Sequence, residues 1–164
     1  MPVALLASLA IAATGPCAGA AERADPVVRR HAIRCLVNSA RAAHGLPRLR
    51  LSRPLGTAAG RHARDMVRRR YFGHTSPGGS TPTSRARHAG YRAAAIGETL
   101  AAASGTRATP GFTVRAWLRS ADHRRVLLNP ALRDVGVALV PGAPLSGGVD
   151  RRGTTIVLDA GRRG

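Results

Sequence analysis

Two histidines and a glutamate are the side chains whose types and settings could support chemistry in this sequence. His74 stands in a loop rich in glycine and proline, where functional residues are frequent, and His123 begins a short helix directly after Asp122. Glu98 is an acid within an apolar stretch. Two imidazoles and one carboxylate are enough to hold Zn²⁺ or another divalent cation with water in the fourth position. The same three side chains could instead form a hydrogen-bonded structural network.

Two serines permit a different mechanism. Ser120 or Ser76 could act as the nucleophile, with His123 or His74 as the base and Glu98 as the group that orients the base. The sequence contains no Gly-x-Ser-x-Gly elbow, the strained turn that presents such a serine in many hydrolases. The residue types therefore permit a serine-type hydrolase, but no backbone motif supports it.

Capping patterns predict the helices that position these residues. An Asx or hydroxyl side chain before proline marks a helix start, and glycine marks a stop. The first predicted helix is Pro26–His44, the second is capped by Ser52 and runs to about Arg70, and the third is Pro82–His88. The next helix starts at Thr109-Pro110. A further turn is capped by Asp122 and ends at Asn129-Pro130.

Helical spacing also predicts which side chains are buried. In the second helix His62 lies on an apolar face and is expected to be a core histidine, whereas the arginine-rich face is expected to be solvated. Trp117 is expected to anchor its helix in the core. The predicted buried stripe of the first helix consists of Val28, Ala32, Cys35, Leu36, Ser39, Ala40 and Ala43.

The strands follow the helices. Val135–Val140 and Thr154–Leu158 predict an antiparallel hairpin with a long loop from Pro141 to Gly153, and the chain around Glu98 is expected to be extended. The length of 164 residues fits one domain. Helices first and strands late predict an α+β domain with helices packed on a small antiparallel sheet.

The first twenty residues resemble an export signal. They carry no charged side chain, contain an apolar run and end in small residues at 18–20, which predicts a signal peptide cleaved after Ala20. The run is too short to span a bilayer, so no transmembrane segment is expected. Cleavage there would remove Cys17, leaving Cys35 unpaired as a small buried residue and excluding a disulfide. Lipid attachment at Cys17 is a variant that the preceding Pro16 disfavours.

The charge is strongly positive. The chain has 26 basic residues, all of them arginine, against 8 acidic residues, for a net charge of +18. Such a surface should bind anionic lipid or an acidic cell-wall polymer, and salt should weaken this binding. Absence of lysine is also typical of GC-rich coding, so part of the excess could reflect composition. Nucleic acid is a disfavoured partner, because aromatic residues are scarce and no recognition motif is present.

Several short motifs resemble, in order and spacing, the bacterial secreted branch of the CAP (SCP-like) superfamily. The resemblance covers residues 35–161, and residues 21–34 begin the first helix. The motifs are Cys35-Leu36-Val37-Asn38 with Arg41, Gly45-Leu46-Pro47, His62-Ala63-Arg64-Asp65-Met66, Tyr71-Phe72-Gly73-His74-Thr75-Ser76-Pro77, Ala89-Gly90-Tyr91, Gly97-Glu98, Trp117-Leu118-Arg119-Ser120, Asp122-His123-Arg124 and Val135-Gly136-Val137.

The resemblance implies a three-layer α-β-α sandwich with a central cleft. His74 and His123 match the two cleft histidines of the superfamily and Glu98 matches its first glutamate, a set that binds divalent metal in some members. The second glutamate position is Ser120 here, which weakens the case for metal. Thr99 and Ala160 also depart from the common pattern.

Together these observations predict a secreted or cell-wall-associated protein. Non-catalytic roles are common in the superfamily, so the resemblance implies a binding module for lipid, cell-wall polymer or a protein partner. The alternative is a metal-dependent or serine-type hydrolase that acts on peptide or wall material.

Overall fold

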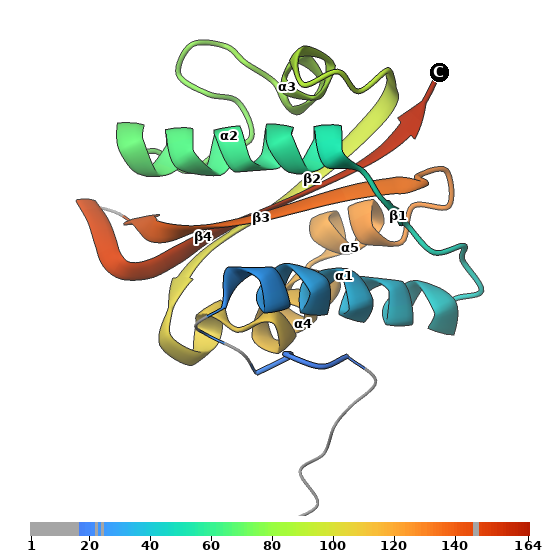
Figure 1. The fold of residues 1–164 in the computed structure, drawn as a ribbon, viewed down its shortest axis with the longest axis horizontal. Helices are drawn as coiled ribbons and strands as arrows, with labels where there is room; N and C mark the ends of the chain where they lie inside the picture. Colours follow the sequence, from blue (N-terminus) through green and yellow to red (C-terminus); the bar gives the residue numbers. More distant parts are fainter. Residues whose placement is uncertain (1–16, 22, 24, 146–147) are drawn as a thin grey trace, which may run out of the picture.

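A sheet lies between two layers of helices, with α2 and α3 on one side and α1, α4 and α5 on the other (Figure 1). The structure is a computed structural model that describes residues 17–21, 23, 25–145 and 148–164. The predicted three-layer α+β sandwich is confirmed. The helices are α1 (Pro26–Ala43), α2 (Arg53–Arg69), α3 (Pro82–His88), α4 (Pro110–Arg119) and α5 (Ala121–Leu127), with a 3-10 turn at Gly105–Ala108, and the strands are β1 (Arg50–Leu51), β2 (Ala93–Ser104), β3 (Asp134–Leu145) and β4 (Gly148–Arg163).

Side-chain caps start the helices as the sequence predicts, with one exception. Asp25 accepts hydrogen bonds from two backbone N–H groups at the start of α1, and Ser52 and Thr109 each accept one at the start of α2 and α4. The prediction for Asp122 is wrong: Ser120 is the N-cap of α5, and Asp122 lies inside its first turn. Its carboxylate still suits the positive end of the helix.

The sheet is mixed, in the order β1-β3-β4-β2. β2, β3 and β4 pair antiparallel, but the short β1 adds a parallel edge that the sequence analysis does not predict. The predicted loop from Pro141 to Gly153 is mostly strand, because pairing continues past a register shift between Pro141 and Ala143. Gly142, with φ of 94°, absorbs that irregularity. β2 is left as the other edge of the sheet.

Each face of the sheet has its own apolar core, because successive strand residues point to opposite faces. On the α1 and α4 side Val137, Ile156 and Leu158 pack with Trp117. On the α2 side the smaller cluster includes Met66 and the alanines of the helix. The start of α2 lies close to β3: a Cβ added at residue 136 would lie 2.0 Å from the backbone nitrogen of residue 56. Glycine at 136 is therefore required by packing.

The buried face of α1 differs from the predicted stripe. Val28, Ser39 and Ala43 are exposed, whereas Arg29 and Arg41 are buried. Arg41 is fully enclosed, and its guanidinium donates to the backbone oxygens of residues 47, 127, 129 and 132. A buried cation is tolerated when its donors are satisfied. Arg41 thereby ties α1 to the end of α5 and to the segment that leads into β3.

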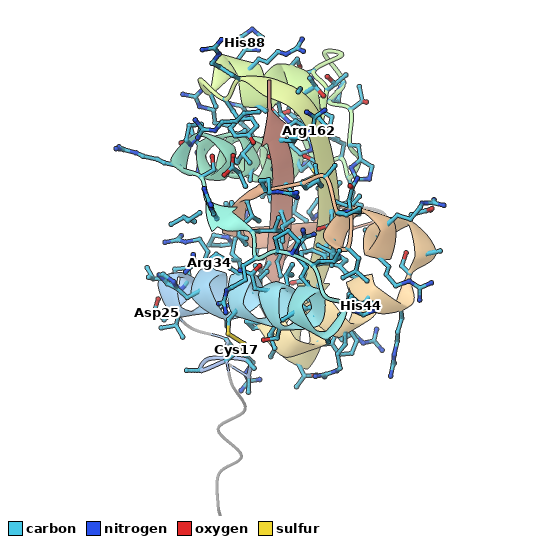
Figure 2. All side chains as sticks on the ribbon, turned by 90° about the vertical axis from the view of Figure 1, so that its right-hand side faces the viewer. Cys17, Asp25, Arg34, His44, His88 and Arg162 are labelled. Atoms are coloured by element: carbon cyan, nitrogen blue, oxygen red, sulfur yellow. A yellow bond between two sulfur atoms is a disulfide. The ribbon has the colours of Figure 1, made fainter. Side chains whose placement is uncertain are left out.

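An unpaired Cys35 is expected only after cleavage at Ala20, and the structure includes Cys17. Cys17 and Cys35 form a disulfide, with their Cα atoms 5.6 Å apart. Figure 2 shows this bond beneath α1. The backbone oxygen of Ala20 also accepts a hydrogen bond of 2.8 Å from the N–H of Gly111 at the start of α4. A cut after Ala20 would remove one half of the disulfide. Residues 1–16 of the predicted signal peptide lie outside the described residues.

Candidate functional site

A buried ion network around Glu98 forms the centre of the candidate site. Glu98 lies on β2 and points to the face of the sheet that α2 and α3 cover, where its side chain is 1% exposed. One carboxylate oxygen accepts a hydrogen bond of 2.8 Å from Nδ1 of His74, and the other accepts one of 2.7 Å from Nη2 of Arg85 on α3. Two of the predicted site residues, His74 and Glu98, are therefore in direct contact.

The loop that carries His74 is attached to α3 by the same arginine. Nη1 of Arg85 donates to the backbone oxygen of Ser80, and Nη2 donates to that of His74. Thr81 and Ser84 form a capping box that starts α3 and places Arg85 one turn into the helix. The loop and helix together bring a cation and an imidazole to the same carboxylate.

Burial and charge act in opposite directions on this network. Burial favours the neutral form of Glu98, but the hydrogen bond from His74 and the charge of Arg85 outweigh it, so the pKa of Glu98 lies below its usual value. The hydrogen bond to Glu98 raises the pKa of His74, against a smaller effect of burial. Because Nδ1 of His74 donates to the carboxylate, Nε2 is the nitrogen left for a ligand or water.

His62 supports the site from α2. It is buried, as predicted, and Nε2 donates a hydrogen bond of 2.9 Å to the backbone oxygen of Gly73 next to His74. Burial lowers the pKa of His62. Tyr71 Oη lies 3.3 Å from Nδ1 of His62 and donates to Asp65 at 2.8 Å, and burial together with that bond raises the pKa of Tyr71 to about 12. His62 therefore fixes the loop next to His74, and its Nε2 lies 3.9 Å from Oε1 of Glu98.

A second carboxyl group lies opposite Glu98 in the sheet. Asp159 on β4 is its cross-strand partner and is fully buried. Neither of its carboxyl oxygens has a hydrogen-bond partner among the described residues. Burial, followed by the nearby charge of Glu98, raises the pKa of Asp159 well above its usual value. Both effects favour the neutral form of the Asp159 carboxyl group.

The ion network does not present the three donors of a zinc site. Arg85 and His74 occupy both oxygens of Glu98, and Nε2 of His62 is directed to a backbone oxygen. Across the described ranges, no group of three or more His, Cys, Asp or Glu side chains is placed to hold a metal ion. The hydrogen bonds of Glu98 in this structure are made to His74 and Arg85.

His123 and Ser120 line an apolar cavity of about 480 Å³. The cavity runs along the free edge of β2 at Leu100–Ala103 and is closed by α4 on one side. Burial lowers the pKa of His123, and the charge of His74 lowers it further. Nδ1 of His123 is buried and has no hydrogen-bond partner among the described residues. These effects favour the neutral form of His123, which lines the cavity.

The serines are not aligned as nucleophiles. Ser76 Oγ accepts a hydrogen bond from the backbone N–H of Ser80. No hydrogen bond joins Ser76 or Ser120 to a histidine within the part of the chain that the structure describes. A serine-type mechanism needs such a contact between nucleophile and base.

Arg85 and Asp159 are the site residues that the sequence analysis misses. A buried acid needs a counter-charge, so the isolated Glu98 indicated that some arginine must approach it. With 26 arginines in the chain, the sequence alone does not say which one. The sequence does not indicate a role for Asp159, because its position beside Glu98 results from the pairing of β2 with β4.

Comparisons with known proteins agree with this architecture. The family described as the cysteine-rich secretory protein family (CAP) matches residues 35–157. The protein YkwD of Bacillus subtilis is 32% identical over 105 residues, which are 64% of this chain and 40% of that protein. An extracellular protein of Bacillus anthracis that contains an SCP domain has a TM-score of 0.68 at 27% identity, over 84% of this chain and 41% of its own.

A third similarity extends over most of both chains. An outer surface protein of Borrelia burgdorferi has a TM-score of 0.66 at 21% identity, covering 80% of this chain and 90% of its own. At that identity the likeness concerns the fold. No helix of the described residues has the length and apolar character needed to cross a membrane.

Proposed function

Because this chain belongs to the cysteine-rich secretory protein (CAP) family, we propose that it is an extracellular binding module that holds an amphiphile with a single acyl chain. The observation that carries the proposal is the apolar cavity along the edge of β2. The relatives described as extracellular or outer surface proteins support the location.

The cavity wall suits an acyl chain. Phe72 and Phe112 line it and are 49% and 40% exposed, which is unusual for large apolar side chains. Trp117 forms part of the wall and donates from Nε1 to the backbone oxygen of Leu100 at 2.9 Å. Covering these surfaces with an acyl chain would remove apolar area from water, at about 25 cal/mol per Å².

The rim of the cavity suits an anionic headgroup. Arg107 is exposed and lines the cavity, and His123 and Ser120 add polar groups to the lining. A carboxylate or phosphate head at Arg107 would gain charge-assisted hydrogen bonds while its chain contacts the aromatic wall. We therefore assign the ligand to fatty acids and related acyl lipids with an anionic head.

Tryptophan fluorescence tests this proposal directly, because Trp117 is the sole tryptophan of the chain. We expect dibromostearic acid to quench Trp117 emission with saturation, and non-brominated stearic acid to compete. Ala116→Leu places a larger side chain at the cavity lining on an exposed helix position, and should weaken binding about tenfold, or about 1.4 kcal/mol.

Ala42→Leu is the matched control, because Ala42 is an exposed helical alanine on α1 that does not line the cavity. It should leave the affinity unchanged. Arg107→Gln should weaken binding of stearic acid more than binding of monostearoylglycerol, which has a neutral head. Absence of quenching, or equal affinity of the Ala116→Leu variant and the wild type, would overturn the proposal.

One observation favours a second candidate, a hydrolase that activates water. The His74–Glu98 pair resembles the base and orienting acid of hydrolytic enzymes, and the His74 side chain is 54% exposed. In this mechanism Nε2 of His74 would accept a proton from water as the water attacks a peptide or wall bond. Hydrolysis of peptidoglycan fragments that persists unchanged in His74→Gln would refute this role.

A further inference from the structure

We propose that the arginines along α2 form a second binding site, which takes an extended polymer bearing phosphate groups. This site runs along α2 and reaches α1 across the sheet, and it is separate from the acyl cavity at the edge of β2. It is formed by two hollows that meet at Arg64. We call this site the arginine path. Its residues are Arg30, Arg34, Arg53, Arg61, Arg64, Arg68 and Arg85.

The two hollows make the arginine path continuous. One has a volume of about 660 Å³ and lies between α2, the loop of residues 71–81 and α3. The other has a volume of about 590 Å³ and lies between α1, α2 and β3, beside Arg34, which is labelled in Figure 2. Arg64 lines both hollows, so a chain that leaves one enters the other. A single bound phosphate would need only one of them.

The helix sets the length of the arginine path. Arg53, Arg61, Arg64 and Arg68 fall at spacings that place them on one side of α2, and the positions are exposed. Fifteen residues separate the first from the last, which corresponds to about 22 Å at 1.5 Å per residue. This length fits several consecutive units of a polymer.

The charge of the arginine path is largely uncompensated. No salt bridge involves Arg30, Arg34, Arg53, Arg61 or Arg64 within the described residues. Asp65 is the one acidic residue in the linings of the two hollows, and it already accepts from Tyr71 and Arg68. Among the described residues, Arg68 and Arg85 are the members of the arginine path that form salt bridges, so five of its seven arginines have no acidic partner there.

The inner end of the arginine path also offers hydrogen-bond donors. Arg85 lines the first hollow, but its Nη atoms donate to Ser80, His74 and Glu98 and its Nε is buried, so it contributes positive charge and no free donor. Ser76 and Ser80 add hydroxyl groups to the same wall. Arginine suits phosphate in particular, because its planar guanidinium can donate two parallel hydrogen bonds to two oxygens.

The shape and lining of the hollows select among polyanions. Concave surfaces accept a polymer strand more readily than the flat surface of a membrane. The linings contain no Phe, Tyr or Trp side chain on which bases could stack, so a nucleic acid would gain little beyond its phosphates. The structure therefore points to a phosphate polymer without aromatic bases.

Binding of long-chain polyphosphate, measured by calorimetry at two salt concentrations, tests the proposal. Arg61→Gln combined with Arg64→Gln should weaken binding about tenfold or more and should reduce the dependence of affinity on salt. Lysine at both positions should give an intermediate affinity, because it keeps the charge and loses the bidentate geometry.

The matched control is Arg115→Gln combined with Arg119→Gln. It removes the same charge from exposed positions of α4, on the opposite helical layer. This control should change the affinity less than about twofold. Both double variants should bind stearic acid like the wild type, which shows that they are folded and that the two sites are independent.

Four results would overturn the proposal. Equal weakening by the two double variants would mean that polyphosphate follows net charge alone. Absence of polyphosphate binding would show that the arginine path does not bind phosphate polymers. Poly-glutamate binding as tight as polyphosphate of matched charge would remove the preference for phosphate. Tighter binding of oligo-dT, lost in the Arg61→Gln, Arg64→Gln variant, would assign the arginine path to nucleic acid.

Discussion

Replacing Glu98 by alanine should destabilise the fold, because it leaves Arg85 without its counter-charge. The carboxylate accepts hydrogen bonds of 2.8 Å from His74 and 2.7 Å from Arg85, and both carboxylate and guanidinium are largely buried. Removing one member of a buried ion pair is costly, because the other charge stays in a medium of low polarity.

The magnitude follows from those two bonds. Hydrogen bonds to charged groups contribute about 1.5–3 kcal/mol each. Arg85 keeps its bonds to the backbone oxygens of Ser80 and His74, which limits the cost of the orphaned charge. We therefore expect Glu98→Ala to lower the free energy of unfolding by about 3–5 kcal/mol. Glu98→Gln keeps the shape and one acceptor, so it should cost about 1.5–3 kcal/mol.

Urea unfolding followed by Trp117 fluorescence is the assay, at pH 7 and at pH 3.5. The pKa of Glu98 is lowered in the folded state, so its contribution is complete above the ordinary value of 4.5 and declines as pH falls through the folded value. The difference between wild type and Glu98→Gln should therefore shrink at low pH. Asp122→Asn is the control, because its pair with Arg125 is exposed and should contribute less than about 1 kcal/mol.

A small effect would refute this reasoning. If Glu98→Ala costs no more than Asp122→Asn at pH 7, the ion network is not a stabilising centre. A difference between wild type and Glu98→Gln that grows toward low pH would contradict the direction of the pKa shift of Glu98.

Two further predictions concern the disulfide and His74. In a chain that retains Cys17, Cys35→Ser should lower the free energy of unfolding by about 3 kcal/mol, because the bond closes a segment with a sequence separation of 18 residues. A reductant should lower the free energy of unfolding of the wild type by a similar amount. Denaturant midpoints that stay the same after both the substitution and the reduction would contradict this prediction. The raised pKa of His74 contributes stability in full below pH 6.5, which is lost as pH rises through the higher folded value. His74→Gln should therefore destabilise more at pH 5.5 than at pH 8.5 in thermal melts, and equal losses at the two pH values would exclude this linkage.

The local features of the fold were predictable because they depend on neighbouring residues. Asp25, Ser52 and Thr109 cap the helices that follow them, and the extended chain around Glu98 is β2. Each of these signals acts within about four residues. The mistakes on α1 have the opposite origin. Arg41 is buried because carbonyl groups about 90 residues away accept its hydrogen bonds, and no spacing rule within the helix contains that fact.

The sequence by itself determined the chemistry that is available: two histidines, one acid in an apolar stretch, an excess of arginine, and the caps that start the helices. Only the tertiary structure decided how these groups pair. Arg85 and His74 donate to the two oxygens of Glu98, and His123 lines an apolar cavity. The physical reason is that hydrogen bonds and ion pairs act over a few ångströms in space. The partners that come so close are chosen by strand pairing and helix packing across the whole chain.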